Sequence, residues 1–316
     1  MFTSGGTESN NLAIRGIAAQ APATRRRIVT STVEHPATTA PLALLEASGW
    51  TLTRVPVAAS GILDLDAGLG ALGDDVALVT VMLAQNETGA LMPVAELAAD
   101  ARAYGAIVHT DAAQAIGKIP VSVDDLGVDL LSIAAHKCYG PKGIGALYVR
   151  RGTPLSPLVV GAGQEGGLRP GTENVAGIVG LGAAARLATD QLTDDAARIA
   201  QLRDELWTAL EAKVPGIRRH TPVESACRTR CSSRSPAPSA ERSLPGSPSS
   251  PRQPGPPATP ASTPPTRRSS PWVSPPTSPW ARSASRSGAA PPEPRWKRPR
   301  GCSSAPMGSL SPPRRH

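Results

Sequence analysis

The chain has 316 residues and a formal net charge of +8, but the charge is unevenly distributed. Residues 227–316 hold 15 of the 33 basic and 2 of the 25 acidic residues, a net charge of +13, which leaves −5 for residues 1–226. The same segment holds 22 of the 34 prolines. Residues 1–226 therefore have the composition of a mildly acidic globular protein, without the basic surface that marks nucleic-acid binding.

Targeting and metal signals are absent from the sequence. No apolar run reaches the length of a membrane span, and we find no signal peptide. The four cysteines lack the paired spacing of a zinc site; they are Cys138, Cys227, Cys231 and Cys302. We therefore expect a reduced, cytoplasmic protein without a bound metal.

Strand-like and helix-like segments alternate along residues 1–226, and this alternation predicts an α/β fold with a mostly parallel sheet. After a strand end at 1–4, the predicted strands are 27–33, 50–56, 77–83, 106–110, 130–135 and 146–149. The predicted helices are 10–19, one that starts at Pro36, 64–72, 93–104, 174–188 and 193–214. A glycine-rich stretch at 161–174 is expected to be a long functional loop.

The first candidate catalytic residue is Lys137, which follows the predicted buried strand 130–135 and precedes a glycine-rich turn. Burial lowers the pKa of a lysine ammonium group, so a buried lysine at a strand end can capture a carbonyl group. The alternative is a solvated lysine on a surface hairpin. Taken alone, the stretch favours this alternative, because lysines are rarely buried.

Polar residues follow three other predicted strands, and each has two interpretations. Ser4–Ser9 enters a helix and can cradle an anion, or Ser4 or Thr7 simply caps that helix. His35 stands where ligands bind in α/β sheets, or it caps or packs against a helix. Asp111 can hold a protonated ring nitrogen, or it is a helix N-cap.

Six motifs in this order resemble the cysteine desulfurase branch of the class V aminotransferases, which are fold-type I enzymes that use pyridoxal 5′-phosphate (PLP). They are TSGGTESNN, EHPA, QNETG, HTDAAQAIGK, HKCYGPKGIGALYVRR and RPGTEN, and the resemblance covers residues 1 to about 226. It implies the conversion of L-cysteine to L-alanine, with the sulfur left as an enzyme persulfide. Selenocysteine lyase is the alternative within PLP chemistry. A non-catalytic fragment with a basic, nucleic-acid-binding tail is the alternative of another class.

The resemblance implies a role at the PLP ring for five residues. Lys137 would capture the PLP aldehyde, and His35 would stack on the ring and assist proton transfer. Asp111 would hold the protonated ring nitrogen. Asn86 and Gln114 would face the phenolic oxygen of the ring, and Asn86 would also contact the substrate.

The resemblance also implies phosphate contacts and partners. Gly6, Thr7 and His136 would bind the PLP phosphate, and Thr172 would reach the phosphate of a neighbouring subunit, which implies a homodimer. Arg169 would contact the substrate. The further partner would be a sulfur-acceptor protein or an iron–sulfur scaffold protein.

The sequence departs from the family pattern in three ways. Ala134 stands where the family often has a serine that contacts the phosphate. Some tens of residues that precede TSGGT in the family are missing, and so is the loop that carries the sulfur-accepting cysteine. We therefore expect little or no desulfurase activity from this chain.

We expect three segments: a PLP-binding large domain at 1–190, a helix that leads into an incomplete small domain at 191–226, and an unpacked, disordered tail at 227–316. We expect that the tail is translated from a shifted reading frame. GC-rich codons chosen for residues 227–288 and read one base out of phase give segments similar to the family's C-terminal domain. The missing cysteine would then span the codons of Pro257 and Ala258.

Overall fold

The computed structural model describes residues 1–227 and 233–234, all within the first of the two units into which the chain divides, Met1–Pro245. Seven strands form one sheet in the order β1-β7-β6-β5-β4-β2-β3. They are β1 (Phe2–Thr3), β2 (Arg27–Ser31), β3 (Thr51–Val55), β4 (Val76–Thr80), β5 (Ile107–Asp111), β6 (Leu130–Ala134) and β7 (Gly145–Val149).

Strands β2 to β6 pair in parallel, and β7 runs antiparallel to both of its neighbours, β6 and β1. The carboxyl ends of β1, β2, β4, β5 and β6 therefore lie along the same edge of the sheet. In parallel α/β sheets this edge is where ligands bind. The predicted α/β fold with a mostly parallel sheet is confirmed.

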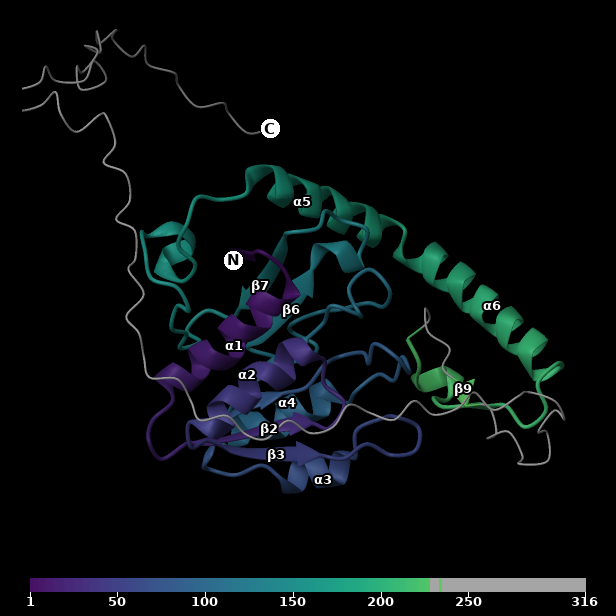
Figure 1. Cartoon of the computed structure of the whole chain (residues 1–316), viewed down its shortest axis with the longest axis horizontal. Helices are drawn as coiled ribbons and strands as arrows, with labels where there is room; N and C mark the ends of the chain where they lie inside the picture. The colour runs from purple at the N-terminus through teal and green to yellow at the C-terminus, as the bar shows by residue number, and fades with distance from the viewer. Residues whose placement is uncertain (228–232, 235–316) are drawn as a thin grey trace, which may run out of the picture. The chain divides into compact units, whose positions relative to one another are not determined.

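The helices α1 (Gly6–Gln20), α2 (Pro36–Ala47), α3 (Leu65–Gly70) and α4 (Val94–Ala103) surround the sheet (Figure 1). Neighbouring residues along a strand point to opposite faces, and both faces are buried. One apolar core joins α1 and α2 to strand residues that include Ile28, Leu78 and Leu130. The other core joins α4 to the next residue of each strand, Val29, Val79 and Leu131.

Two further helices follow the sheet, α5 (Val175–Asp190) and α6 (Leu192–Glu211), which succeed each other along one side of the sheet in Figure 1. The predicted elements are thus present, with ends that differ by a few residues. No helix within the described residues is long and apolar enough to cross a membrane. The predicted boundary at residue 190 coincides with the end of α5, but the division into domains stays a prediction.

A close backbone contact fixes the start of α1. A Cβ atom added to Gly145 of β7 would lie 2.7 Å from the Gly5 Cα atom and 2.7 Å from the Ile133 carbonyl oxygen. Gly5 has a φ of 154°, which side-chain-bearing residues rarely adopt. Glycine at both positions therefore lets the chain turn from β1 directly into α1 at the carboxyl edge of the sheet.

The expectation that packing stops at Cys227 is wrong for Cys227 itself. Its side chain is 1 % exposed, and its backbone N–H donates to the Gly89 carbonyl oxygen at 2.7 Å. The short strand β8 (Arg218–Arg219) also pairs with β9 (Ser233–Arg234). The small Cys227 side chain fills a gap in an existing apolar core, which tail composition could not indicate. The remaining tail, including the predicted shift of reading frame, lies outside the described residues.

Candidate active site

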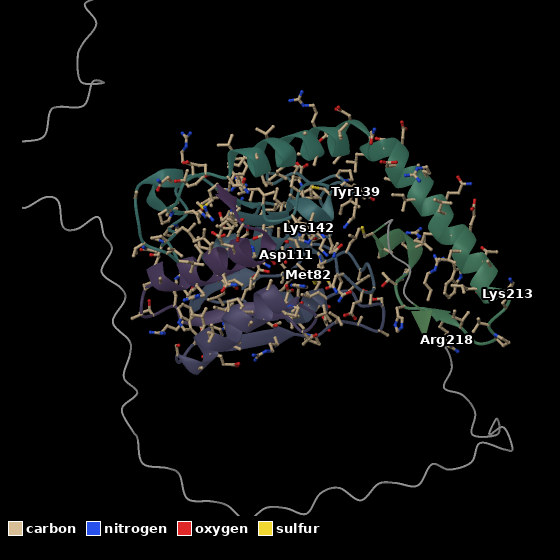
Figure 2. The ribbon with its side chains drawn as sticks, turned by 45° about the horizontal axis from the view of Figure 1, so that its top comes forward. Met82, Asp111, Tyr139, Lys142, Lys213 and Arg218 are labelled. Atoms are coloured by element: carbon tan, nitrogen blue, oxygen red, sulfur yellow. The ribbon has the colours of Figure 1, made fainter. Side chains whose placement is uncertain are left out.

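A cavity of about 180 Å³ opens at the carboxyl edge of the sheet. Eight of its lining residues were predicted from the sequence: Gly6, Thr7, His35, Asn86, Asp111, Gln114, His136 and Lys137. The other four are Ala37, Met82, Ala113 and Ala134. Figure 2 shows Met82 and Asp111 within the interior of the fold. The topology explains this assembly, because the predicted residues follow β1, β2, β4, β5 and β6, whose carboxyl ends lie side by side.

The floor of the cavity carries the Asp111 carboxylate, which is 7 % exposed at the end of β5. Its Oδ1 atom accepts the Ala113 backbone N–H at 2.9 Å, and its Oδ2 atom accepts the Asn10 side-chain Nδ2–H at 2.6 Å. These two donors fix the rotation of the carboxylate. Asp111 begins a turn rather than a helix, so the N-cap interpretation does not account for it.

His35 combines both of the interpretations that the sequence left open. It is the N-cap of α2, where its Nδ1 atom accepts the Ala37 N–H at 3.0 Å, and it also lines the cavity. An Nδ1 atom that accepts a hydrogen bond carries no proton, so the neutral ring carries its proton on Nε2. The capping bond thus sets both the tautomer and the ring orientation.

The turn after β4 is organised by Gln85, whose Oε1 atom accepts three hydrogen bonds. The donors are the Glu87 N–H at 2.6 Å, the Thr88 N–H at 2.7 Å and the Thr88 hydroxyl at 3.1 Å. Gln85 is buried, and its neighbour Asn86 lines the cavity. A buried side chain that holds the turn from within therefore presents Asn86 at the cavity.

Of the two interpretations of Lys137, the structure shows the solvated lysine. Lys137 and its neighbour His136 are exposed in the short helical turn η1 (Ala135–Lys137) that follows β6. Within the described residues, no hydrogen bond or ion pair holds the Lys137 ammonium group. Desolvation, followed by the charges of Lys137 and Lys142, lowers the pKa of His136. Lys137 thus lies at the exposed edge of the cavity, which it shares with Asp111.

The beginning of α1 also lines the cavity, next to the end of β6. Its N-cap is Gly5, which supplies no side-chain hydrogen bond, so neither Ser4 nor Thr7 acts as the predicted capping side chain. The first N–H groups of a helix lack intrahelical acceptors and attract anions. Thr7 is exposed there, and a Cβ atom on Gly6 would lie 3.3 Å from the Ala134 side chain. The features are those of an anion site, although Ala134 brings no hydroxyl group to it.

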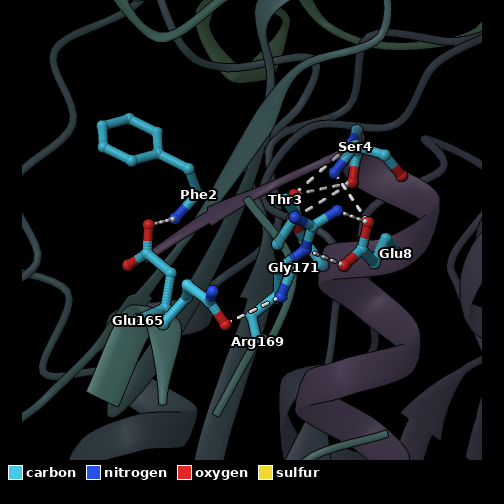
Figure 3. Close-up of polar contacts among 10 residues, drawn as sticks. Phe2, Thr3, Ser4, Glu8, Glu165, Arg169 and Gly171 are labelled. Atoms are coloured by element: carbon cyan, nitrogen blue, oxygen red, sulfur yellow. Dashed lines mark hydrogen bonds and ion pairs between the residues drawn. The ribbon is translucent and has the colours of Figure 1, made fainter. Parts of the chain in front are cut away.

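Two predicted residues do not line this cavity. Arg169 donates from Nε to the Glu8 Oε1 atom at 2.9 Å, and Glu8 also accepts the Ser4 N–H at 2.7 Å (Figure 3). Arg169 and Thr172 border a separate cavity of about 190 Å³. Within one chain, Arg169 therefore fastens the loop at 161–174 to α1, and the predicted contacts of Arg169 with substrate and of Thr172 with a second subunit stay predictions.

The sequence reasoning missed Asn10, which holds Asp111, and Glu34, whose Oε1 atom accepts the Met82 N–H at 3.0 Å. A signal for Asn10 was available. It occupies the same helical stripe as Ala13, Ile14 and Ile17, which are all buried. A polar residue on the apolar face of a helix needs a buried partner.

The sequence is similar to proteins of one known family. Residues 1–235 match the family described as Aminotransferase class-V. The cysteine desulfurase IscS of Dictyoglomus turgidum is 48 % identical over 217 residues, which are 69 % of this chain and 55 % of that protein.

The fold is also similar to that of solved structures. A NifS-like protein matches with a TM-score of 0.69 at 38 % identity, over 72 % of this chain and 62 % of its own. SspA in complex with cysteine matches with a TM-score of 0.57 at 41 % identity, over 58 % of this chain and 54 % of its own. The chain spans about half the length of the curated relatives that it matches. Its sequence and its fold show that it belongs to the class-V aminotransferase family.

Proposed function

We propose that this chain carries the PLP site of a cysteine desulfurase, which converts L-cysteine and an enzyme thiol to L-alanine and an enzyme persulfide. The observation that carries the proposal is one cavity with a carboxylate floor, a free lysine at the rim and a helix N-terminus at the side. The similarity to cysteine desulfurases, and to a structure described as containing cysteine, supports this choice of substrate.

The residues present fit PLP. The group has an aldehyde, a basic ring nitrogen and a phosphate, which match an amine, a carboxylate and an anion site respectively. The Lys137 amine, the Asp111 carboxylate and the start of α1 supply these three partners around a single cavity. Cavities of roughly 150 Å³ hold a benzene ring. The space of about 180 Å³ is therefore large enough for a single ring whose substituents extend to the open rim.

We assign the following roles to the residues of this chain. Lys137 Nζ would hold the aldehyde carbon of the bound group and would move a proton at the substrate Cα atom. The Asp111 carboxylate would hold the proton of the ring nitrogen. His35 would lie against the ring, with a proton on Nε2. When bound, PLP supplies an electron-withdrawing ring that stabilises negative charge at the substrate Cα atom.

Neither cysteine in the described part of the chain suits the role of sulfur acceptor. Cys138 and Cys227 are both buried, and neither lines the cavity. Desolvation raises the pKa of the Cys138 thiol, which leaves little of the nucleophilic thiolate. The described residues thus supply no suitable sulfur acceptor, and we propose that persulfide turnover by this chain is low. We also propose that a homodimer and a sulfur-acceptor protein belong to the complete reaction.

The test is PLP binding by the full chain and by Lys137→Ala. We expect the wild-type chain to develop a visible absorbance band with PLP, and borohydride reduction to attach PLP covalently at Lys137. The Lys137→Ala variant should show neither. The control Lys213→Ala removes an exposed lysine that does not line the cavity and should keep both signals. A wild-type chain without the band, or a modified residue other than Lys137, would contradict the proposal.

A further inference from the structure

Asn10 lies between two elements of the site. It follows Gly6 by four residues, so both occupy one face of α1. Gly6 lines the anion side of the cavity, whereas the Asn10 amide reaches Asp111 on the floor. The same helix face therefore contacts both ends of the cavity.

The Asn10 amide has an acceptor for each of its two N–H groups. Its Nδ2 atom lies 2.6 Å from Asp111 Oδ2 and 3.2 Å from Thr38 Oγ1 of α2. Asn10 and Thr38 are both fully buried. This short, water-excluded contact to a carboxylate is of the stronger kind of hydrogen bond.

The orientation of the amide is dictated by Asp111. The Asn10 Oδ1 atom is buried and has no partner among the described residues. If the amide were rotated by half a turn, this oxygen would face Asp111 Oδ2 across the same short distance, and neither N–H would reach its present acceptor. A buried acceptor without a partner is energetically costly. The amide keeps this orientation because it allows both N–H groups to donate to Asp111 and Thr38.

We propose that Asn10, itself held by Thr38, is the positioning residue that orients the Asp111 carboxylate toward the ring nitrogen of the cofactor. The inference rests on the proposed PLP site, to which it adds the buried residues Asn10 and Thr38. Asn10 acts through Asp111 and touches no reacting atom.

The experiment measures PLP affinity and the pH dependence of the PLP absorbance band in the full chain. Asn10→Ala removes the donor, and we expect PLP to bind more weakly, by at most roughly 100-fold, the limit set by one hydrogen bond to a charged group. The pH dependence of the band should shift as well, because Asp111, the proposed partner of the ring proton, is no longer held in a fixed orientation by Asn10. Covalent capture by Lys137 should persist at saturating PLP.

Two further comparisons separate positioning from folding. Thr38→Val removes only the hydroxyl that holds Asn10 and should weaken PLP binding a few-fold, whereas Thr38→Ser keeps the hydroxyl and should match the wild type. Gln20→Ala, which removes an exposed amide at the end of the same helix, is the control and should change nothing at the site.

Each outcome has a defined meaning. If wild type binds PLP, and Asn10→Ala and Thr38→Val keep its affinity and its pH profile, the positioning role is refuted while the PLP site stands. A wild-type chain that binds no PLP refutes the proposed function instead. If Asn10→Ala does not fold, the Thr38 variants test the positioning role. Weaker PLP binding by Thr38→Val than by Thr38→Ser supports the role, and equal binding refutes it.

Discussion

Glu34 should make the stability of the protein fall as the pH rises. Its carboxyl group is buried, with Oε1 accepting the Ser31 hydroxyl at 2.6 Å and the Met82 N–H at 3.0 Å. Burial raises the pKa of Glu34 from its usual 4.5 to about 8, the two donors oppose this rise, and the nearby Asp111 charge adds to it. The unpartnered Oε2 atom supplies no compensating contact within the described residues.

The sign and size of the effect follow from proton linkage. Between pH 4.5 and about 8 the folded protein keeps a proton that the unfolded chain has released. The stabilisation is therefore complete below pH 4.5 and is lost as the pH rises to about 8, where the folded carboxyl also ionises. At 1.36 kcal/mol per pKa unit, the loss across this window amounts to at most about 5 kcal/mol.

The assay is urea unfolding of wild type and Glu34→Gln at pH 5, 6, 7 and 8, followed by circular dichroism. Glutamine copies the shape of the protonated acid but cannot ionise, so other titrating groups cancel in the difference. The variant should gain stability relative to wild type at each step, by at most about 4 kcal/mol in total over the assayed range. Glu96→Gln, which changes an exposed carboxylate on α4, should show no such trend. A difference between wild type and Glu34→Gln that stays constant from pH 5 to 8 would refute the reasoning.

The remaining predictions concern other buried or tightly packed groups. Burial lowers the pKa of His109 from 6.5 to about 3, so the stability that the neutral ring gives the folded wild type above pH 6.5 is lost as the pH falls. His109→Asn has no such ring to protonate. Its deficit in unfolding free energy relative to wild type, measured in urea, should therefore be about 3 kcal/mol smaller at pH 4 than at pH 7. Gly145→Ala, whose new Cβ atom would meet two backbone atoms at 2.7 Å, should lose about 1–3 kcal/mol in thermal unfolding. Gly182→Ala, in open space on α5, should be neutral or stabilising by comparison. Glu8→Gln should lower the free energy of unfolding by at most about 1 kcal/mol, since the ion pair of Glu8 with Arg169 is partly exposed. The substitution should also speed amide hydrogen exchange in the loop at 161–174. An unchanged exchange rate would show that the ion pair does not hold the loop.

Sequence alone determined the order of the elements and most of the cavity. Apolar periodicity and turn residues act over a few positions, so each strand end could be recognised from its own neighbourhood. Asp111 ends β5, His35 and Lys137 follow β2 and β6 within a few residues, and parallel strands bring such positions to one edge. The six motifs then gave these positions chemical roles that local pattern left open.

Only the tertiary structure decided which distant groups meet. Asn10 and Asp111 are 101 residues apart, and Glu8 and Arg169 are 161 apart; both contacts depend on where α1 lies over the sheet. The exposure of Lys137 and the burial of Cys227 likewise depend on what the rest of the fold covers. Burial is a property of packing between elements rather than of a residue's sequence neighbours, and for this reason the sequence could name the residues of the cavity but not the buried layer that holds them.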